Sequence, residues 1–223
     1  MLADARMKFF LHETTSTNDE AKRGGRGGAE HGTVWVVESQ TAGRGRQGRT
    51  WVSTPGNLLF TVLLRLDGPI THLPLVGLAA GLAVRDAIGL GATVKWPNDV
   101  LVRGKKIAGI LAEACDGFLV VGIGINVATC PSDIGATSVV AEGGSADRRA
   151  LLDRVLEGLL RDAPLVAAGG LEPIHVRLAA VDALRGRSVR TDDGIEGVAE
   201  GIDPEGRLIV GSHRLAYGEV HLI

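Results

Sequence analysis

Up to about residue 185, the apolar residues of the chain gather either in short runs or in longer periodic stretches. The short runs are rich in β-branched residues and are bounded by glycine, proline or asparagine, a pattern typical of strands. Predicted strands cover residues 8–12, 33–38, 57–66, 93–96, 99–102, 106–114 and 118–125. Apolar residues spaced three to four apart predict helices in the longer stretches. Predicted helices cover 74–88, 150–161 and 171–184, and a shorter helix follows the cap-forming residues 15–20 and ends at glycines 24–28.

The pattern changes after this point. From residue 187 onward, apolar and polar residues alternate, with turn-forming groups between them. Four or five short strands fit into this segment, which predicts a small β-barrel. We therefore predict an α+β protein. A central mixed sheet with flanking helices would occupy residues 1–184, and a separate barrel domain would occupy residues 185–223.

Composition and charge narrow the classes of function. The 223 residues are 45% hydrophobic and 22% charged, as is usual for a soluble globular protein. A net charge of −2 argues against a protein that coats nucleic acid through bulk charge. No apolar run is long enough to cross a membrane, and the N-terminus does not resemble a secretory signal. Cys115 and Cys130 lack the spacing of a metal site. Reduced thiols and a cytoplasmic location are the simpler expectation, with a disulfide between them as the alternative.

The heptapeptide GRGRQGR at residues 43–49 places three arginines on a glycine-rich backbone. Glycine loses about 0.5–1 kcal/mol more conformational entropy than alanine in an ordered element, so a loop is predicted here. Its arginines suit an anion, and we expect the loop to become ordered when that anion binds. Taken alone, the same pattern equally fits a solvated basic turn that touches RNA phosphate.

Three other polar segments fall, like this loop, at predicted strand or loop ends. They are STN at 16–18, KWPND at 95–99 with KKIAGI at 105–110, and GIGIN at 122–126. In this order, and with QTAGRGRQGR at 40–49, they closely resemble the motifs of the biotin protein ligase family. The resemblance covers nearly the whole chain, and it implies a catalytic domain followed by an SH3-like β-barrel. The predicted catalytic strands begin too early for the DNA-binding domain of many bacterial relatives, which implies the single-function class.

The resemblance implies an ATP- and Mg²⁺-dependent enzyme that converts biotin into biotinyl-5′-AMP and releases pyrophosphate. The biotinyl group then passes to one lysine of a biotin carboxyl carrier protein, as in acetyl-CoA or pyruvate carboxylase. Both groups that react in the first step are anions, so the site must supply cations and amide donors. The biotin carboxylate is itself the nucleophile, so no nucleophilic side chain is needed. Relatives often associate as homodimers, and neither DNA nor a membrane is an expected partner.

The matching motifs assign roles to individual residues. The expected catalytic residues are Lys106, Arg44 and Arg46. The expected biotin-binding residues are Ser16, Thr17, Asn18, Gln40, Arg44, Gly45, Arg46, Lys106 and Gly109. The residues expected to bind ATP and the adenylate are Trp51, Lys95, Asn98, Asp99 and Asn126. No side chain is expected to hold a resident metal ion.

The residue types support some of these roles and leave plainer explanations for others. A lysine in an apolar strand, such as Lys106, is costly to bury without an anionic partner, whereas Lys105 would face solvent. Residues 16–18 fit a helix N-cap as well as a ligand with one carbonyl and two N–H groups. Each of three other residues also has a plainer explanation. Trp51 could be an aromatic at the rim, Asp99 a turn residue and Asn126 a residue that ends a strand. The six histidines have no partner at triad or metal spacing and are interpreted as structural or solvated.

Two other functions fit parts of the sequence. A lipoate or octanoate ligase or transferase shares the sheet and the reactive lysine, but lacks the combination of GRGRxGR with KWPND. A binding module, which could sense biotin or a nucleotide or contact RNA, needs no chemistry. The presence of Arg44, Arg46 and Lys106 together argues against an inactive site.

Overall fold

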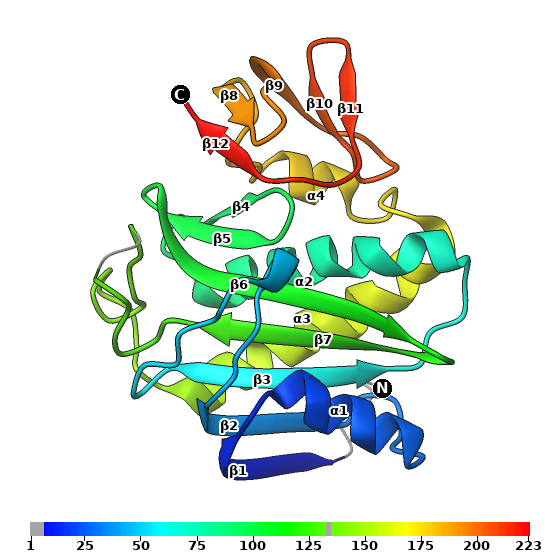
Figure 1. Ribbon diagram of the computed structural model, residues 1–223, viewed down its shortest axis with the longest axis vertical. Helices are drawn as coiled ribbons and strands as arrows, with labels where there is room; N and C mark the ends of the chain where they lie inside the picture. The colour runs from blue at the N-terminus through cyan, green and yellow to red at the C-terminus, as the bar shows by residue number, and fades with distance from the viewer. Residues whose placement is uncertain (1–6, 133–134) are drawn as a thin grey trace.

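The structure, a computed structural model, describes residues 7–132 and 135–223. Its main part is a seven-stranded sheet with helices on both faces (Figure 1). The strands lie in the order β1-β2-β3-β7-β6-β5-β4. Their bounds are Lys8–Thr14 (β1), Val34–Gln40 (β2), Leu58–Leu64 (β3), Thr93–Lys95 (β4), Asp99–Val102 (β5), Lys105–Cys115 (β6) and Phe118–Ile125 (β7). β1 and β2 are parallel and the other neighbours are antiparallel, so the sheet is mixed, as predicted.

Helices α1 (Thr17–Arg26), α2 (Val76–Ile88) and α3 (Arg148–Gly169) cover the two faces of this sheet. Successive side chains of a strand point to opposite faces. Val34 of β2 accordingly packs into the larger apolar core with α2 and α3, whereas Trp35 packs into a smaller core with Ala21 of α1. Helix α1 therefore lies on the face opposite α2 and α3 (Figure 1). Within the described residues, no helix has the length and apolar character needed to cross a membrane.

Helix α1 runs through two of the glycines that were predicted to end it. It continues through Gly24 and Gly25 and ends at Arg26. A Cβ atom at Gly24 would come within 2.3 Å of Trp35, and one at Gly25 within 2.5 Å of Phe118. The two glycines therefore let the helix approach the sheet closely. This packing outweighs the roughly 1 kcal/mol that a helical glycine costs relative to alanine.

The helix predicted over residues 171–184 is wrong for most of its length. Only the short helix α4 (His175–Ala179) forms there, and α3 extends further than predicted, through Pro164 to Gly169. Two short 3₁₀ helices, η1 (Arg46–Gly48) and η2 (Ile70–Leu75), complete the helical elements. Beyond α4, Asp182 forms a parallel β-bridge with Val94 at the edge of the main sheet. The backbone here therefore pairs with a strand and does not continue as a helix.

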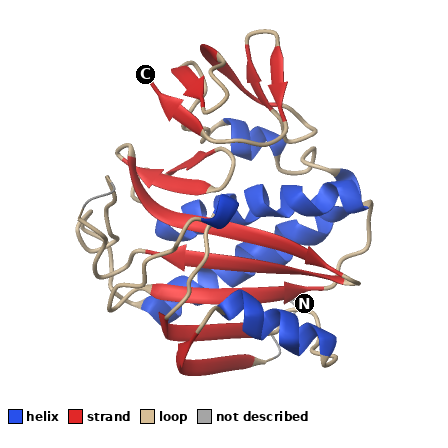
Figure 2. Cartoon of the chain, in the orientation of Figure 1, coloured by secondary structure: helices blue, strands red, loops and turns tan. Residues whose placement is uncertain are grey.

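A second, antiparallel sheet follows near the C-terminus (Figure 2). Its strands lie in the order β11-β10-β9-β8-β12. Their bounds are Ser188–Thr191 (β8), Glu196–Ile202 (β9), Leu208–Val210 (β10), His213–Leu215 (β11) and Val220–Leu222 (β12). This sheet is consistent with the predicted SH3-like unit, although no pairing among the described residues joins β11 to β12 to close a barrel. Val189 and Leu208 belong to the same apolar core as α2 and α3, so the two sheets pack together. The domain boundary between residues 184 and 185 stays a prediction.

The link into this second sheet contains a carboxylate with an unusual environment. Asp182 Oδ1 accepts a hydrogen bond of 2.9 Å from the backbone N–H of Leu184. Its Oδ2 atom is buried and finds no hydrogen-bond partner among the described residues. Burial raises the pKa of this carboxyl above its ordinary value because it disfavours the charged form.

We predict that Asp182→Asn raises the free energy of unfolding by about 1 kcal/mol at pH 7, because asparagine keeps the acceptor and removes the charge. The folded-state pKa lies above the unfolded value. The gain should therefore be complete above the folded-state pKa and disappear as pH falls below about 4, where both states are protonated. Denaturant titrations of both proteins at pH 7 and in mild acid measure this difference. A variant that is less stable than the wild type at pH 7 would contradict the prediction.

Candidate active site

Three glycines of β6 and β7 leave a bare area on the sheet face that carries α1. Gly109 and Gly124 pair across the two strands, and Gly122 lies two residues before Gly124 on β7. A Cβ atom at Gly122 would lie 2.2 Å from Asn18, and one at Gly124 would lie 2.5 Å from the indole of Trp51. Side chains from other elements therefore come down onto the sheet here. The glycines form the floor of a cavity of about 360 Å³.

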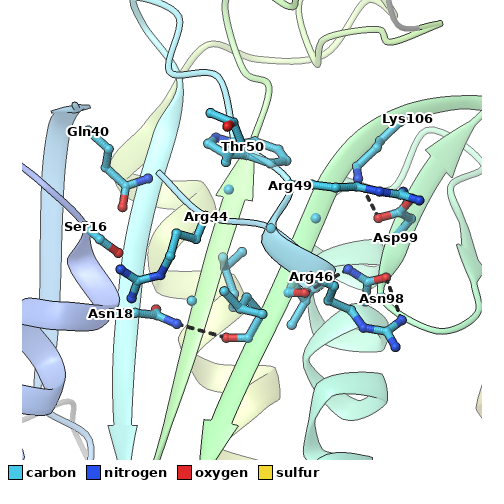
Figure 3. Close-up of a pocket in the computed structure, with 18 of the residues that line it drawn as sticks. Ser16, Asn18, Gln40, Arg44, Arg46, Arg49, Thr50, Asn98, Asp99 and Lys106 are labelled. Atoms are coloured by element: carbon cyan, nitrogen blue, oxygen red, sulfur yellow. Dashed lines mark hydrogen bonds and ion pairs between the residues drawn. The ribbon is translucent and has the colours of Figure 1, made fainter. Parts of the chain in front are cut away.

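Most of the predicted site residues line this cavity, and Figure 3 shows how several of them converge on it. The predicted residues at the wall are Ser16, Thr17, Asn18, Gln40, Arg44, Gly45, Arg46, Trp51, Lys95, Asn98, Asp99, Lys106 and Gly109. Lining residues that the sequence analysis did not assign include Arg49, Thr50, Gly122, Gly124, Glu219 and His221. The fold thus brings together the start of α1, the arginine segment, the β4–β5 corner, the middle of β6 and β7, and β12.

The polar end of the cavity is built at the start of α1. Ser16 occupies the N-cap position, yet its side chain makes no capping hydrogen bond. Its buried hydroxyl is therefore available to the cavity that it lines. Gln40 Oε1 accepts hydrogen bonds from the backbone N–H of Thr17 at 2.8 Å and from the Thr17 hydroxyl at 3.2 Å. This contact fixes the amide so that its nitrogen is left for a ligand (Figure 3).

Asn18 is held more completely than its neighbours. Its Oδ1 accepts a hydrogen bond from the Thr61 hydroxyl at 2.6 Å. Its Nδ2 donates to Glu113 Oε2 at 2.6 Å and to the carbonyl of Leu111 at 3.3 Å. Because both ends of the amide are engaged, Asn18 forms a fixed wall above Gly122. The structure gives it a scaffolding role, and its predicted contact with biotin stays a prediction.

The arginine segment folds as a small hairpin across the mouth of the cavity. Arg44 bridges Thr50 as an antiparallel partner, and the backbone N–H of Gly45 donates to the carbonyl of Arg49 at 2.7 Å. The backbone N–H of Trp51 donates to the carbonyl of Gly43 at 2.9 Å. The 3₁₀ turn η1 forms the tip. We call residues 43–51 the arginine hairpin.

The three arginines of the hairpin have different partners. Arg44 makes two hydrogen bonds to Asp19 of α1, at 2.7 and 2.6 Å. Arg49 pairs with Glu219, just before β12, at 3.3 Å. Arg46 reaches the side-chain oxygen of Asn98 and the carbonyl of Gly218, both at 3.5 Å. Among the described residues Arg46 has no carboxylate partner, so its charge is the one most available to an anionic ligand.

The Arg44–Asp19 contact also changes the acidity of both groups. The hydrogen bond from Arg44 holds the pKa of the Asp19 carboxyl below its ordinary value. The same hydrogen bond raises the pKa of the Arg44 guanidinium. Both groups are therefore charged at neutral pH, and the contact is an ion pair.

The opposite end of the cavity holds Lys106. Its Nζ lies 2.7 Å from Asp99 Oδ1 and 5.8 Å from the centre of a Trp51 ring. Asp99 and Asn98 follow the cis peptide bond between Trp96 and Pro97. The Asn98 amide donates to the carbonyl of Ile110 at 3.0 Å, which fixes this corner against β6. Asp99 and Trp51, two of the predicted nucleotide residues, thus lie beside Lys106.

Positive charge predominates around the cavity. Its described lining contains five cationic residues and two acidic residues. The cationic residues are Arg44, Arg46, Arg49, Lys95 and Lys106, and the acidic residues are Asp99 and Glu219. The positive charge is therefore local to the cavity, because the net charge of the whole chain is −2. A cavity lined in this way favours a ligand that carries several negative charges.

Asn126 is the predicted site residue that the structure does not place at the cavity wall. Its side chain is buried, donates to the carbonyl of Thr137 at 3.1 Å and accepts from Asn57 at 3.2 Å. These bonds tie the end of β7 to neighbouring loops. The geometry therefore favours the plainer explanation, a residue that ends a strand, over direct contact with the adenylate.

The C-terminal contributions had no recognisable sequence signal. Glu219 and His221 reach the cavity from β12 and the residue before it, although they lie more than a hundred residues from the arginine hairpin. The sequence predicts only a structural or solvated role for His221. It is largely exposed and contacts Asp192 Oδ1 at 2.7 Å, but it also lines the cavity.

Comparisons with known proteins identify a family that matches this chain. The model of the biotin/lipoate A/B protein ligase family matches residues 11–129. The chain is 38% identical to a biotin–acetyl-CoA-carboxylase ligase of Mycobacterium tuberculosis, over 88% of this chain and 80% of the relative. It is 37% identical to a ligase of the same name from Paracoccus denitrificans, over 90% and 92% of the two chains.

A solved structure gives the same result. It is a biotin protein ligase from Aquifex aeolicus in complex with biotin and ATP. It superposes with a TM-score of 0.80 at 28% identity, covering 98% of this chain and 99% of the other. The matched family region contains every motif on the cavity wall except the C-terminal residues. The chain belongs to the biotin/lipoate A/B protein ligase family.

Proposed function

We infer that the protein is an ATP-dependent biotin–protein ligase, which activates biotin as biotinyl-5′-AMP and transfers the biotinyl group to a lysine of a carrier protein. The observation that carries this inference is one cavity with two different ends. Neutral hydrogen-bonding groups at the start of α1 suit an uncharged ring, whereas the lysines and arginines suit phosphates. The relatives are named as biotin ligases, and the solved relative holds biotin and ATP together.

The first step joins two anions. An oxygen of the biotin carboxylate attacks the α-phosphorus of ATP, and the bond from that phosphorus to the bridging oxygen breaks to release pyrophosphate. Repulsion between carboxylate and phosphate opposes this approach, so cations at the junction lower the barrier. We assign this role to Lys106, where the carboxylate would replace Asp99 as the partner of its ammonium group, and to Arg46. In the second step the amine of the acceptor lysine attacks the acyl carbon, loses a proton, and AMP leaves.

The remaining wall residues receive roles by position. Ser16 and Gln40 would hydrogen-bond the ureido group of biotin, and Gly109 lets the ligand chain approach the sheet. Trp51 would cover the adenylate. Lys95 and Asn98 would contact phosphate oxygens. The family also includes lipoate ligases, but these wall residues favour biotin over lipoate. The dithiolane ring of lipoate has no N–H or carbonyl group that could hydrogen-bond with Ser16 and Gln40.

Mg²⁺ would arrive with ATP. Magnesium is usually held by one or two carboxylates together with substrate phosphates, and it does not require a cluster of protein ligands. The described residues contain no group of three or more potential metal ligands. Asp99 is the carboxylate beside the predicted nucleotide residues and fits this requirement. Once Lys106 pairs with biotin, Asp99 would be free to hold Mg²⁺, which would supply positive charge beside the phosphate oxygens.

Ligand-dependent melting tests the proposed function. We predict that biotin with Mg²⁺ and ATP raises the melting temperature by about 10 °C, because a tightly bound adenylate stabilises by mass action. Either ligand alone should give a much smaller shift. The control is an ATP analogue with a methylene group between the α- and β-phosphorus, which cannot release pyrophosphate. With this analogue, the shift in melting temperature for both ligands together should equal the sum of the shifts for each ligand alone. A larger shift with lipoate or RNA than with biotin would reject the proposal.

A further inference from the structure

The side chain of Arg44 is turned away from the centre of the cavity that its backbone lines. Figure 3 shows its guanidinium directed toward α1. There it forms a two-pronged contact with both oxygens of Asp19, at 2.7 and 2.6 Å. A planar guanidinium and a carboxylate match in this geometry, so the contact fixes orientation as well as distance. The charge of Arg44 is therefore already matched by a protein carboxylate.

This contact joins two walls of the cavity. Asp19 lies in the first turn of α1, directly after the polar residues 16–18. Arg44 lies at the base of the arginine hairpin, where it pairs with Thr50. A second carboxylate, Glu113 of β6, lies 3.9 Å from the guanidinium. Glu113 is itself held by Asn18 and by Lys22 of α1, each at 2.6 Å. Arg44 is thus docked on a carboxylate pair that the fold holds in place.

The other two arginines of the hairpin contact Glu219, Asn98 and Gly218 at 3.3 to 3.5 Å, and these contacts are longer than those of Arg44 with Asp19. Glycines stand at 43, 45 and 48, and Gln47 adopts a left-handed conformation with φ of 53°. A backbone of this kind loses much conformational freedom when it is fixed. Neither Arg46 nor Arg49 is buried. A directed ion pair at the hairpin base therefore limits the opening of the whole segment.

We propose that Asp19 is a positioning residue, which holds Arg44 and so keeps the arginine hairpin closed over the activated intermediate. The proposal rests on the proposed function, and it assigns different roles to Arg44 and Arg46. Arg44 anchors the hairpin with its side chain. Arg46 is left to meet the anion.

Simple electrostatics predicts the opposite effect for loss of Asp19. Removing a carboxylate beside a cationic cavity strengthens its attraction for ATP and for the adenylate. If Asp19 mattered only as a nearby charge, Asp19→Asn would bind both ligands more tightly. If it positions the hairpin, the same variant should release the adenylate faster. The sign of the change separates the two explanations.

The experiment compares Asp19→Asn and Asp19→Glu with the wild type and with Glu196→Gln. Glu196 forms an exposed ion pair with Arg190 in the C-terminal sheet, does not line the cavity, and provides a matched loss of charge. After biotinyl-5′-AMP has formed on the enzyme, its release rate is measured by trapping with excess unlabelled ligand. We expect about threefold to tenfold faster release from Asp19→Asn, partial recovery in Asp19→Glu and no change in Glu196→Gln.

A second readout does not depend on catalysis. Trypsin cleaves after arginine, so the ligand-free hairpin is cut at residues 44, 46 or 49 whenever it opens. Mass spectrometry of the fragments should show these cuts appearing about threefold to tenfold faster in Asp19→Asn than in the control. Unchanged cutting, or slower release of the adenylate, overturns the proposal. A wild type that forms no adenylate instead refutes the proposed function, and the cutting rates still decide whether Asp19 holds the hairpin.

Discussion

Replacing Lys106 with alanine is expected to lower the rate of biotinyl-5′-AMP formation by a factor of about 10²–10³, a usual cost for losing one group that stabilises developing charge. Lys106 is the cation at the end of β6 that faces the cavity, and its ammonium group is held 2.7 Å from Asp99. Without it, no ammonium group at this end of the cavity offsets the charge of the biotin carboxylate. The biotin carboxylate would then meet the α-phosphate with added repulsion.

The neighbouring residue supplies the control. Lys105 is exposed and does not line the cavity. Lys105→Ala removes the same charge one residue away and should leave the rate unchanged. Pyrophosphate release measured with saturating biotin and ATP compares the two variants, and melting temperatures confirm that both are folded. Equal rates for Lys106→Ala and the wild type would remove Lys106 from the mechanism.

Adding a single methyl group to the cavity floor should weaken the binding of biotin strongly. At Gly122 a Cβ atom would lie 2.2 Å from Asn18 Oδ1. The Asn18 amide cannot yield easily, because Thr61 and Glu113 hold its two ends. We therefore expect Gly122→Ala to push Asn18 into the cavity and to weaken biotin binding by about tenfold to a hundredfold, as overpacking costs of 1–3 kcal/mol would produce.

Gly77→Ala is the matched control for this substitution. Gly77 lies in α2, where a Cβ atom would make an ordinary contact of 3.8 Å with Ala112. The control should bind biotin as the wild type does, and it should be equally stable or more stable because alanine favours a helix. Isothermal titration with biotin measures both variants. Unweakened binding by a folded Gly122→Ala would show that the ring does not lie over this part of the sheet.

The sequence predicted the seven strands of the main sheet, and most of the predicted site residues line one cavity, although their individual roles stay predictions. The strands that carry the motifs have strong β-branched patterns, and each motif ends or interrupts a strand, so their convergence on one face followed from the sheet. Gly122 and Gly124 were visible in the GIGIN motif, but their role as a floor needs the register that places Gly124 beside Gly109. That register depends on the pairing of β6 with β7, which no local pattern specifies.

Other features depend on contacts between distant residues and could not be predicted. Glycines were expected to end α1, but Trp35 and Phe118 make Gly24 and Gly25 packing positions. Glu219 reaches Arg49 only because the second sheet packs beside the first. The Asp19–Arg44 pair links a helix to a loop 25 residues away. From the sequence alone, charged residues such as these cannot be distinguished from ordinary solvated residues, because only the fold brings them into contact.

The central claim is that this cavity joins the biotin carboxylate to AMP. A single-turnover reaction tests it most directly, with the purified protein, biotin, Mg²⁺ and ATP labelled at the α-phosphate. The account predicts that biotinyl-5′-AMP and pyrophosphate form in equal amounts, and that a biotin carboxyl carrier domain added afterwards acquires the biotinyl group while AMP is released. Labelled ATP that stays intact with biotin present, or an adenylate that forms with lipoate and not with biotin, would contradict it.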